Sequence, residues 1–247
     1  MKRKKIEAFA DQIEGTRIFS RKELRDYYRT HEKGFKDSAF DMRISYLKSS
    51  GFIRQVGVGK YTMDQRPIFH PPINRSLSRI ANVIGALSVE NSCIWSTEWL
   101  NEFSTHQFHN KLLLIEVDSD MTESVFYQLM DAGISNVYHL PNLDMLNKYI
   151  LESNEAVIIK PIISRSPVDK KRKVIVPRLE KILVDVFVED PELINYSGSE
   201  IYSIFRIAVK KYSINFSQIL NYAGRRGKRE LIRNYLINEI NVDQRLL

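Results

Sequence analysis

The sequence holds little that would mark an exported, membrane-bound or disulfide-stabilised protein. Cys93 is its single cysteine, so the chain cannot form an internal disulfide, and we expect this residue to pack as a small buried hydrophobic group. The longest apolar runs, residues 112–115 and 156–159, are far shorter than the roughly 20 residues that cross a bilayer. The basic residues at positions 2–5 are not followed by the apolar core of a signal peptide. We therefore expect a cytoplasmic protein with no membrane partner.

Signatures of catalysis and cofactor binding are also scarce. His106 and His109 lie three residues apart, but no second histidine pair or nearby cysteine completes a zinc site. No glycine-rich phosphate-binding motif occurs, and the scattered histidines identify no base for Cys93 as a nucleophile. From the sequence we predict no catalytic residue, no cofactor and no metal.

Positive charge, by contrast, is concentrated in two parts of the chain. Residues 1–66 account for the formal net charge of +7, with 16 Lys or Arg against 9 Asp or Glu. Residues 67–160 are acidic, with 5 against 11, and residues 161–247 are basic, with 16 against 10. Two basic segments separated by an acidic one favour a phosphate-bearing or acidic partner, although many basic domains bind neither.

Residues 1–66 show the order of helices that is typical of a winged helix-turn-helix domain. The pattern predicts a helix over residues 5–14 and a second helix opened by a capping box of Ser20 and Glu23. Ser38 is the expected N-cap of a third helix. Apolar residues recur in that helix at the spacing of one helix face, at Phe40, Ile44 and Leu47.

Two strands follow the third helix and would form the wing. We expect them over residues 52–56 and 60–63, on either side of a glycine-containing turn. Prolines cluster after them, and the residue before a proline is pushed away from helical backbone, so we expect a linker at residues 67–73. The first domain is then residues 1–66 and the second is residues 74–247.

A domain of this kind binds duplex DNA by placing its third helix in the major groove. We expect Arg43, at the flank of the outward face, to contact a guanine through its guanidinium group. Arg21 and Lys22 would bind phosphates from the second helix, and Arg54 and Lys60 would do so from the wing. The predicted DNA-binding residues are Arg21, Lys22, Ser38, Met42, Arg43, Ser45, Tyr46, Lys48, Arg54 and Lys60. Winged helices also dock proteins, so a protein-interaction adaptor stays an alternative.

Strands and helices alternate in the second domain, and the pattern becomes helical from Arg178 onward. We expect strands over residues 92–95, 111–117, 136–140 and 156–163, and helices over residues 77–87, 96–103, 122–132 and 143–151. Such alternation predicts a small central sheet covered by helices. The predicted fold class is therefore α+β, with an N-terminal winged helix-turn-helix followed by a mixed α/β domain with a small central sheet and a helical C-terminal region.

Two dense basic runs lie in expected turns of the second domain. They offer added phosphate contacts or a docking surface for an acidic protein, although such runs are often simply solvated. Their residues are Lys170, Lys171, Arg172, Lys173, Arg225, Arg226, Lys228 and Arg229.

Two short motifs carry a resemblance to a known family. Gly57, Gly59 and Tyr61 form a Gly-x-Gly-x-Tyr pattern in the expected wing, and residues 176–185 read Val-Pro-Arg-Leu-Glu-Lys-Ile-Leu-Val-Asp. In these features and in the order of its elements, the chain resembles AbiEi-type antitoxins and regulators of type IV toxin–antitoxin systems. Residues 94–103 are similar to a segment of a related group of bacterial proteins. The resemblance implies repression of the protein's own operon through the winged helix, typically at inverted repeats. It also implies that the C-terminal domain neutralises a co-expressed nucleotidyltransferase-like toxin.

An alternative function is a metal-dependent DNA nuclease of the restriction-endonuclease-like class, targeted by the winged helix. Glu116 and Asp118 lie two residues apart at the end of an expected strand, and Lys160 lies in another, a set that suits Mg²⁺. The usual motif has an acidic residue two positions before the lysine, where this sequence has Ile158. We therefore interpret Glu116 and Asp118 as solvated residues, and we predict a DNA-binding regulator rather than an enzyme.

Overall fold

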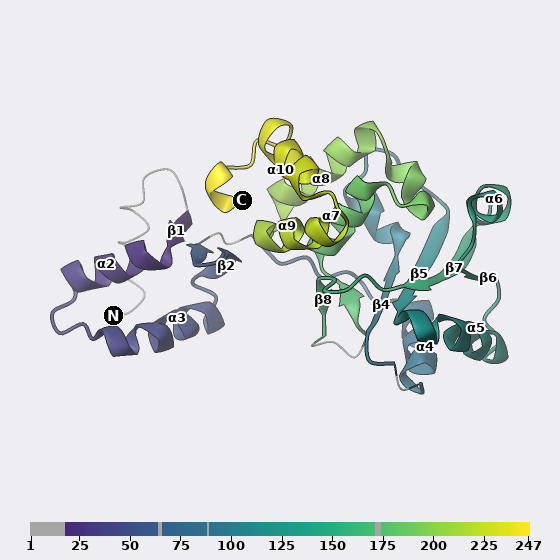
Figure 1. The fold of residues 1–247 in the computed structure, drawn as a ribbon, viewed down its shortest axis with the longest axis horizontal. Helices are drawn as coiled ribbons and strands as arrows, with labels where there is room; N and C mark the ends of the chain where they lie inside the picture. The colour runs from purple at the N-terminus through teal and green to yellow at the C-terminus, as the bar shows by residue number, and fades with distance from the viewer. Residues whose placement is uncertain (1–17, 64–65, 88, 171–173) are drawn as a thin grey trace.

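Two hydrophobic clusters divide the protein into an N-terminal module and a larger body (Figure 1). The computed structural model describes residues 18–63, 66–87, 89–170 and 174–247. The N-terminal module is residues 18–63, and the body is residues 66–247, with a core that extends from Phe69 to Val242. The helix predicted at residues 5–14 lies outside the described residues. Within the described part of the chain, no helix is long and apolar enough to cross a membrane.

The N-terminal module consists of two helices and a three-stranded antiparallel sheet. Its elements are β1 (Ile18–Ser20), α2 (Arg21–His31), a 3₁₀ turn (Asp37–Ala39), α3 (Phe40–Ser49), β2 (Arg54–Gly57) and β3 (Lys60–Thr62). β3 lies in the middle of the sheet and pairs with β1 on one side and β2 on the other. The sequence pattern does not predict β1, because three residues are too few to show the alternation of a strand.

The two helices of the module begin in different ways. The Ser20 hydroxyl accepts a hydrogen bond from the Glu23 N–H at 3.1 Å, and the Glu23 carboxylate accepts one from the Ser20 N–H at 2.5 Å. The predicted capping box of α2 is therefore confirmed. The prediction that Ser38 caps α3 is wrong, because Ser38 lies inside the 3₁₀ turn and α3 begins without a side-chain cap. The N–H groups of Ala39 and Phe40 instead bond to carbonyl groups of the turn.

A four-stranded mixed sheet forms the centre of the body. Its strands are β4 (Ser92–Ser96), β5 (Lys111–Val117), β6 (Val137–His139) and β7 (Glu155–Pro161), in the spatial order β4-β5-β7-β6. β4 runs antiparallel to β5, whereas β5, β7 and β6 are parallel. The predicted small central sheet is confirmed, and its strands end within two residues of the predicted ends.

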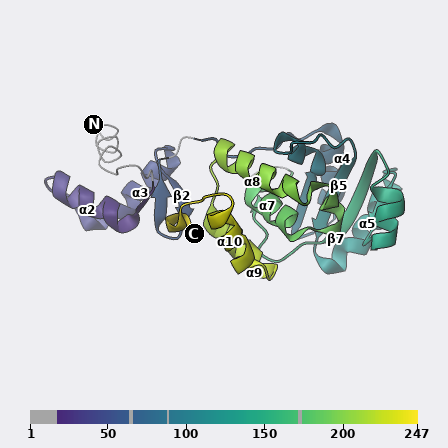
Figure 2. The same cartoon turned by 90° about the horizontal axis from the view of Figure 1, so that it is seen from above.

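Helices cover both faces of this sheet (Figure 2). They are α4 (Arg75–Gly85), α5 (Thr122–Asp131), α7 (Leu179–Val188), α8 (Ser199–Lys211), α9 (Phe216–Arg225) and α10 (Arg229–Asn238). Leu113 of β5 and Ile80 of α4 line one small cavity on one face of the sheet. Glu116 of β5 points to the opposite face, where it contacts Lys181 of α7. The C-terminal helices therefore lie on the side of the sheet that carries Glu116.

Some short elements of the body differ from the sequence prediction. The helix predicted over residues 96–103 is a 3₁₀ helix (Thr97–Glu102), and that over residues 143–151 is a short α6 (Leu143–Met145) followed by a π turn (Leu146–Ile150). Both differences arise because apolar periodicity indicates a helical segment but does not show whether its hydrogen bonds are those of an α, 3₁₀ or π helix. The hairpin of β8 (Val168–Asp169) and β9 (Val176–Pro177) is not predicted, because its strands are too short.

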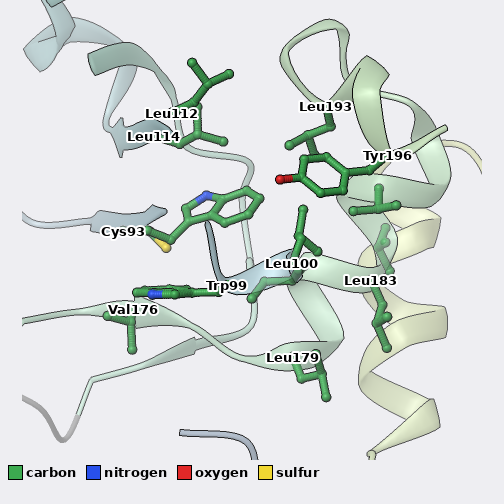
Figure 3. Packing of buried hydrophobic residues seen from close by; sticks show 14 of the residues in the cluster. Cys93, Trp99, Leu100, Leu112, Leu114, Val176, Leu179, Leu183, Leu193 and Tyr196 are labelled. Carbon is green, nitrogen blue, oxygen red and sulfur yellow. The ribbon is translucent and has the colours of Figure 1, made fainter. Parts of the chain in front are cut away.

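Aromatic residues fill the centre of the body core. Figure 3 shows Trp99 between Cys93 of β4 and Val176 of β9. Cys93 is fully buried, as the sequence predicted, and burial raises the pKa of its thiol well above the usual value. The Tyr196 hydroxyl donates a hydrogen bond to the Thr97 carbonyl at 3.1 Å, and burial raises the pKa of Tyr196 to about 12. These side chains serve packing, and the Cys93 thiol stays protonated and unreactive.

The module contacts the body through one side of its sheet. β2 packs against α9, so closely that a Cβ atom added at Gly57 would lie 2.9 Å from Ser217 Oγ. The predicted linker runs along the body surface, where the Ser213 N–H donates to the Pro67 carbonyl at 2.9 Å and Phe69 is buried. The two parts are thus joined by packing as well as by the chain.

Candidate nucleic-acid interface

The side chains of α3 divide into a buried face and an exposed face. The buried face packs into the module core through Phe40, Ile44 and Leu47, as the sequence predicted. The opposite face exposes Met42, Ser45, Tyr46 and Ser49, and we call it the outer face of α3. The Met42 side chain is 73% exposed and that of Tyr46 is 47% exposed. The outer face therefore presents hydroxyl groups and an apolar side chain to the solvent.

Aspartates at the start of α3 neutralise a row of arginines on α2. Arg21, Arg25 and Arg29 follow one another at one-turn spacing. Arg21 pairs with Asp41, while Arg29 and Arg25 reach Asp37 at 2.8 and 3.9 Å. The hydrogen bond from Arg29 lowers the pKa of Asp37. Such exposed pairs contribute little stability. They do, however, cancel the charge that Arg21 was expected to offer to phosphates.

Arg43 lies at the edge of the buried face of α3 rather than on its outer face. Its guanidinium binds both carboxylate oxygens of Glu32, at 2.5 and 3.0 Å, and lies 4.6 Å from the centroid of the Tyr28 ring. Position 43 follows Phe40 by three residues and precedes Leu47 by four, so helix geometry turns its side chain toward α2. The expected outward placement of Arg43 is therefore wrong, and its guanine contact loses its basis.

Four lysines of the module are exposed and form no ion pair with an acidic residue in the described part of the chain. Lys22, Lys33 and Lys36 are exposed, and none of their side chains forms a hydrogen bond or ion pair with another described residue. Lys48 is exposed near the end of α3 and donates one hydrogen bond to Gln55 at 3.2 Å. Lys36 directly precedes the turn that enters α3. Unpaired positive charge therefore lies at both ends of the helix that carries the outer face.

The strands β2 and β3, predicted to act as a wing beside the DNA, lie on the side of the module that meets the body. Val56 and Gly57 are buried there. The Arg54 guanidinium donates to the Arg66 carbonyl and lines a cleft of about 580 Å³ between module and body. Lys60 is half-buried and is itself engaged in a contact. Arg54 thus points toward the body, contrary to the expected backbone contact with DNA.

The predicted basic runs of the body are only partly basic surface. Lys171, Arg172 and Lys173 lie outside the described residues. Exposed side chains are those of Lys170, Arg225, Lys228 and Arg229, the last of which donates to the Leu220 carbonyl at 3.4 Å and to Asn221 Oδ1 at 3.3 Å.

Arg226 does not belong to that surface. Its side chain is 15% exposed and pairs with Asp185 at 3.0 Å and with Asp190. The prediction that Arg226 forms part of an exposed basic run is therefore wrong. The physical reason is that its guanidinium binds two acidic residues below the surface, Asp185 on α7 and Asp190 just after α7.

Arg226 is one member of a buried charge cluster, formed by Glu116, Lys160, Lys181, Asp185, Asp190, Glu192 and Arg226. At its centre, Lys181 Nζ donates to Glu116 Oε1 and to Asp185 Oδ2, each at 2.6 Å. The Trp95 indole also donates to Glu116, at 3.0 Å, and the Tyr222 hydroxyl donates to Asp185, at 2.9 Å. The cluster thus connects β5 with α7 and α9.

Opposite charges favour the ionised forms of Lys181 and Glu116 despite their burial, whereas burial raises the pKa of Asp185. Lys181 is 1% exposed, and although burial opposes its charge, Asp185 and Glu116 raise its pKa well above the ordinary value. Burial would raise the pKa of Glu116, but the positive charge of Lys181 outweighs it and lowers that pKa. Neither group is therefore poised to exchange a proton near neutral pH, as a general acid or base must be. The interpretation of Glu116 as a solvated residue is wrong.

The structure brings two of the three residues of the nuclease alternative together, since Glu116 and Lys160 lie opposite each other on β5 and β7, but each of the three forms its hydrogen bonds with other residues. Glu116 binds Lys181, whereas Asp118 accepts hydrogen bonds from the Asn91 N–H at 2.9 Å and from its side-chain amide at 3.0 Å. Lys160 pairs with Asp190 at 3.1 Å and with Glu192. Across the described residues, no group of three or more His, Cys, Asp or Glu side chains is placed to hold a metal ion. The described geometry therefore gives that alternative no metal site.

Comparison with known families places most of the chain in one of them. A family of unknown function, DUF6577, matches residues 39–242. The chain belongs to DUF6577. No curated protein and no solved structure matches it. The DUF6577 match begins immediately before α3 and continues past α10, so it includes the outer face of α3 and the whole buried charge cluster.

Two lysines of this candidate interface were missed in the sequence. Lys33 and Lys36 lie on either side of Gly34, in the turn that leads into α3, and both precede the DUF6577 match. The available signal was their position in an expected turn beside the predicted recognition helix. The sequence analysis assigned the main DNA contacts to arginines instead, because a sequence does not reveal which basic residues have acidic partners in the fold.

Proposed function

We propose that this DUF6577 protein is a transcriptional regulator that binds duplex DNA with the outer face of α3. The observation that carries the proposal is the separation of charge within the module. Its arginines at positions 21, 25, 29 and 43 are paired with acidic residues, whereas exposed lysines flank α3. An exposed helix face with unpaired cations at its ends suits a major groove bordered by phosphates.

The order of elements supports this assignment. Two helices followed by a two-stranded hairpin, with a short third strand before them, is the arrangement of a winged helix-turn-helix. In that arrangement the second helix of the pair, here α3, enters the groove. Because β2 faces the body, we assign phosphate contacts to the lysines rather than to the wing.

The chemistry of the outer face indicates how sequence would be read. Serine hydroxyls at Ser45 and Ser49 bond to more than one kind of base edge, and the Met42 side chain suits a thymine methyl group. No arginine on this face supplies the bidentate guanine contact that discriminates by about 1–3 kcal/mol. We therefore expect modest sequence preference per module, consistent with an operator of inverted repeats at which the protein represses its own operon.

Salt-dependent binding by the full chain tests this function. A labelled random-sequence duplex would be titrated with protein over a range of salt concentrations, with binding read by fluorescence anisotropy. Changing Lys22 and Lys36 together to Gln removes two phosphate contacts, which should lower the salt slope by about 1.8, since each contact contributes about 0.9. The matched control changes Arg206 and Lys210, exposed on α8, to Gln and should keep the wild-type slope. Equal slopes for both variants would argue against the proposal.

A second candidate function, neutralisation of a co-expressed nucleotidyltransferase-like toxin, is favoured by one surface of the body. Large apolar side chains are exposed on α5, α6 and the adjoining segments around β6, the last strand of the sheet: Tyr127, Met130, Leu140, Leu143, Met145 and Tyr149. Exposed apolar groups beside the edge of a sheet are typical of protein-docking surfaces.

Growth assays test this second function. The full chain would be co-expressed with the product of an adjacent gene that arrests growth. Changing Leu143 and Tyr149 together to Ser should abolish rescue. Changing Leu231 and Tyr202 to Ser, which are 57% and 42% exposed elsewhere on the body, should leave it intact. Equal rescue by both variants would contradict docking at this surface.

A further inference from the structure

A basic groove lies on the body beside the hairpin of β8 and β9. Its volume is about 540 Å³, and its lining includes four cationic side chains: Arg165, Lys170, Arg178 and Arg225. None of the residues that line it in the described part of the chain is acidic. The groove therefore gathers positive charge from three separate segments of the body around one hollow.

The cations of this groove, unlike Arg226 and the paired arginines of the module, form no ion pair with another described residue, although the charge of Arg178 acts on the Glu180 carboxylate next to it in the chain. All four are exposed. Arg178 has only a long contact, 3.5 Å from its guanidinium to Gln218 Oε1. Arg226, directly after Arg225, shows the contrast, since it pairs with Asp185 and Asp190. Like charges held together without partners favour an anionic ligand.

The groove shares its lining residue Arg178 with a cleft that reaches α3. Arg178 lines both the groove and the cleft of about 580 Å³ between body and module, and Lys48 of α3 lines that cleft as well. In Figure 1, α3 and the β8 hairpin lie along the lower side of the molecule, whereas α8 lies on the upper side. The cleft also contains Glu180, whose carboxylate accepts a hydrogen bond from the Asn215 N–H at 2.8 Å, and Asp169, which is itself engaged in a contact. Lys48, Arg54 and Arg178 thus place cationic side chains in the cleft beside these two acidic groups.

We infer that the basic groove binds phosphate groups of duplex DNA next to the segment that α3 contacts. This inference rests on the proposed DNA binding by α3 and extends it to the body. Duplex DNA carries one negative charge per about 1.7 Å of its axis, so a duplex held by α3 presents further phosphates to any cation beside it. Guanidinium groups, of which the groove has three, bind phosphate oxygens through two parallel hydrogen bonds. A duplex is favoured over an acidic protein because Arg178 lines both the groove and the cleft that reaches α3.

The inference is tested on the full chain with the same labelled duplex and salt series. Changing Arg165 and Arg225 together to Gln should lower the salt slope by about 1.8, because each phosphate that a cation neutralises contributes about 0.9. The control with Arg206 and Lys210 changed to Gln removes the same charge from α8 and should keep the wild-type slope. Both pairs are exposed, and melting temperatures equal to that of the wild type would show that folding is intact. A second variant, Lys170→Gln alone, should lower the salt slope by about 0.9 and provides an independent measurement.

The outcomes separate this inference from the function on which it rests. A lower slope for the groove variant, with an unchanged control, supports the inference. If the groove variant keeps the wild-type slope while the Lys22 and Lys36 variant lowers it, the groove does not bind DNA and the function of α3 stands. If the wild-type protein binds no duplex at low salt, the proposed function fails and the inference with it.

Discussion

At the scale of single residues, the basic side chains of the module have two roles. Four arginines pair with acidic residues around α2 and α3, at positions 21, 25, 29 and 43, and four lysines remain exposed, at positions 22, 33, 36 and 48. Arg225 and Arg226 show the same division in the body, where one side chain is exposed and its neighbour pairs with buried carboxylates. A run of basic residues in a sequence predicts a charged segment correctly. It does not show which of these residues pair with acidic residues of distant segments. This is why the sequence placed Arg43 and Arg226 wrongly.

Arg43 provides the first prediction at this scale. Arg43→Ala should lower the free energy of unfolding by about 1–3 kcal/mol, because it removes the two charged hydrogen bonds from the Arg43 guanidinium to Glu32. Both side chains are 24% exposed, so the pair is partly shielded from water. Chemical denaturation followed by circular dichroism measures the change. Arg21→Ala is the control, since that pair is 40% and 73% exposed and should change stability by less than about 1 kcal/mol. Equal small losses in the two variants would contradict the structural role of Arg43.

Lys181 provides the second prediction. Lys181→Met should lower the free energy of unfolding by about 3–5 kcal/mol, because Glu116 and Asp185 are then buried without their shared counter-charge. The control is Lys148→Met, which breaks an exposed pair with Asp144 and should cost less than about 1 kcal/mol. Adding Glu116→Gln to Lys181→Met should recover part of the loss, since one unpaired charge is removed. A double variant less stable than the single one would show that burial of Glu116 as a charge is not the cause.

At the scale of elements, the sequence predicts best where one face of a helix or strand is buried. The apolar spacing of Phe40, Ile44 and Leu47 predicts the buried face of α3, and the apolar strands predict the central sheet. Elements of two or three residues, such as β1 and β8, are too short for such a pattern. The start of α3 shows another limit of prediction. A serine before an apolar helix pattern fits both an N-cap and a residue of a 3₁₀ turn, and here Ser38 lies in the turn.

The two serines at these helix starts give an element-scale prediction. Ser20→Ala should lower the free energy of unfolding by about 0.5–2 kcal/mol, because it removes the acceptor of the Glu23 N–H in the capping box. Ser38→Ala should change it by no more than about 0.5 kcal/mol, since Ser38 is exposed and caps no helix. Parallel denaturation of the two variants measures both. A loss at Ser38 as large as that at Ser20 would contradict the described start of α3.

At the scale of the whole molecule, the side of the module that meets the body could not be predicted. Its contacts join residues far apart in the chain, such as Gly57 of β2 with Ser217 of α9. Local patterns carry no signal for such pairs. Because of these contacts, β2 is turned toward the body while the outer face of α3 stays exposed.

The central claim is that the outer face of α3 contacts DNA, and a single added charge tests it most directly. Ser45 lies on that face, and Ser124 is an exposed serine on α5. Ser45→Asp places a carboxylate beside the phosphates and should weaken duplex binding by the full chain at least about tenfold, or 1.4 kcal/mol. Ser124→Asp, which makes the same change of charge, should bind as the wild type does. Anisotropy titrations of both variants at one low salt concentration decide the matter, and equal Kd values for the two would contradict the claim.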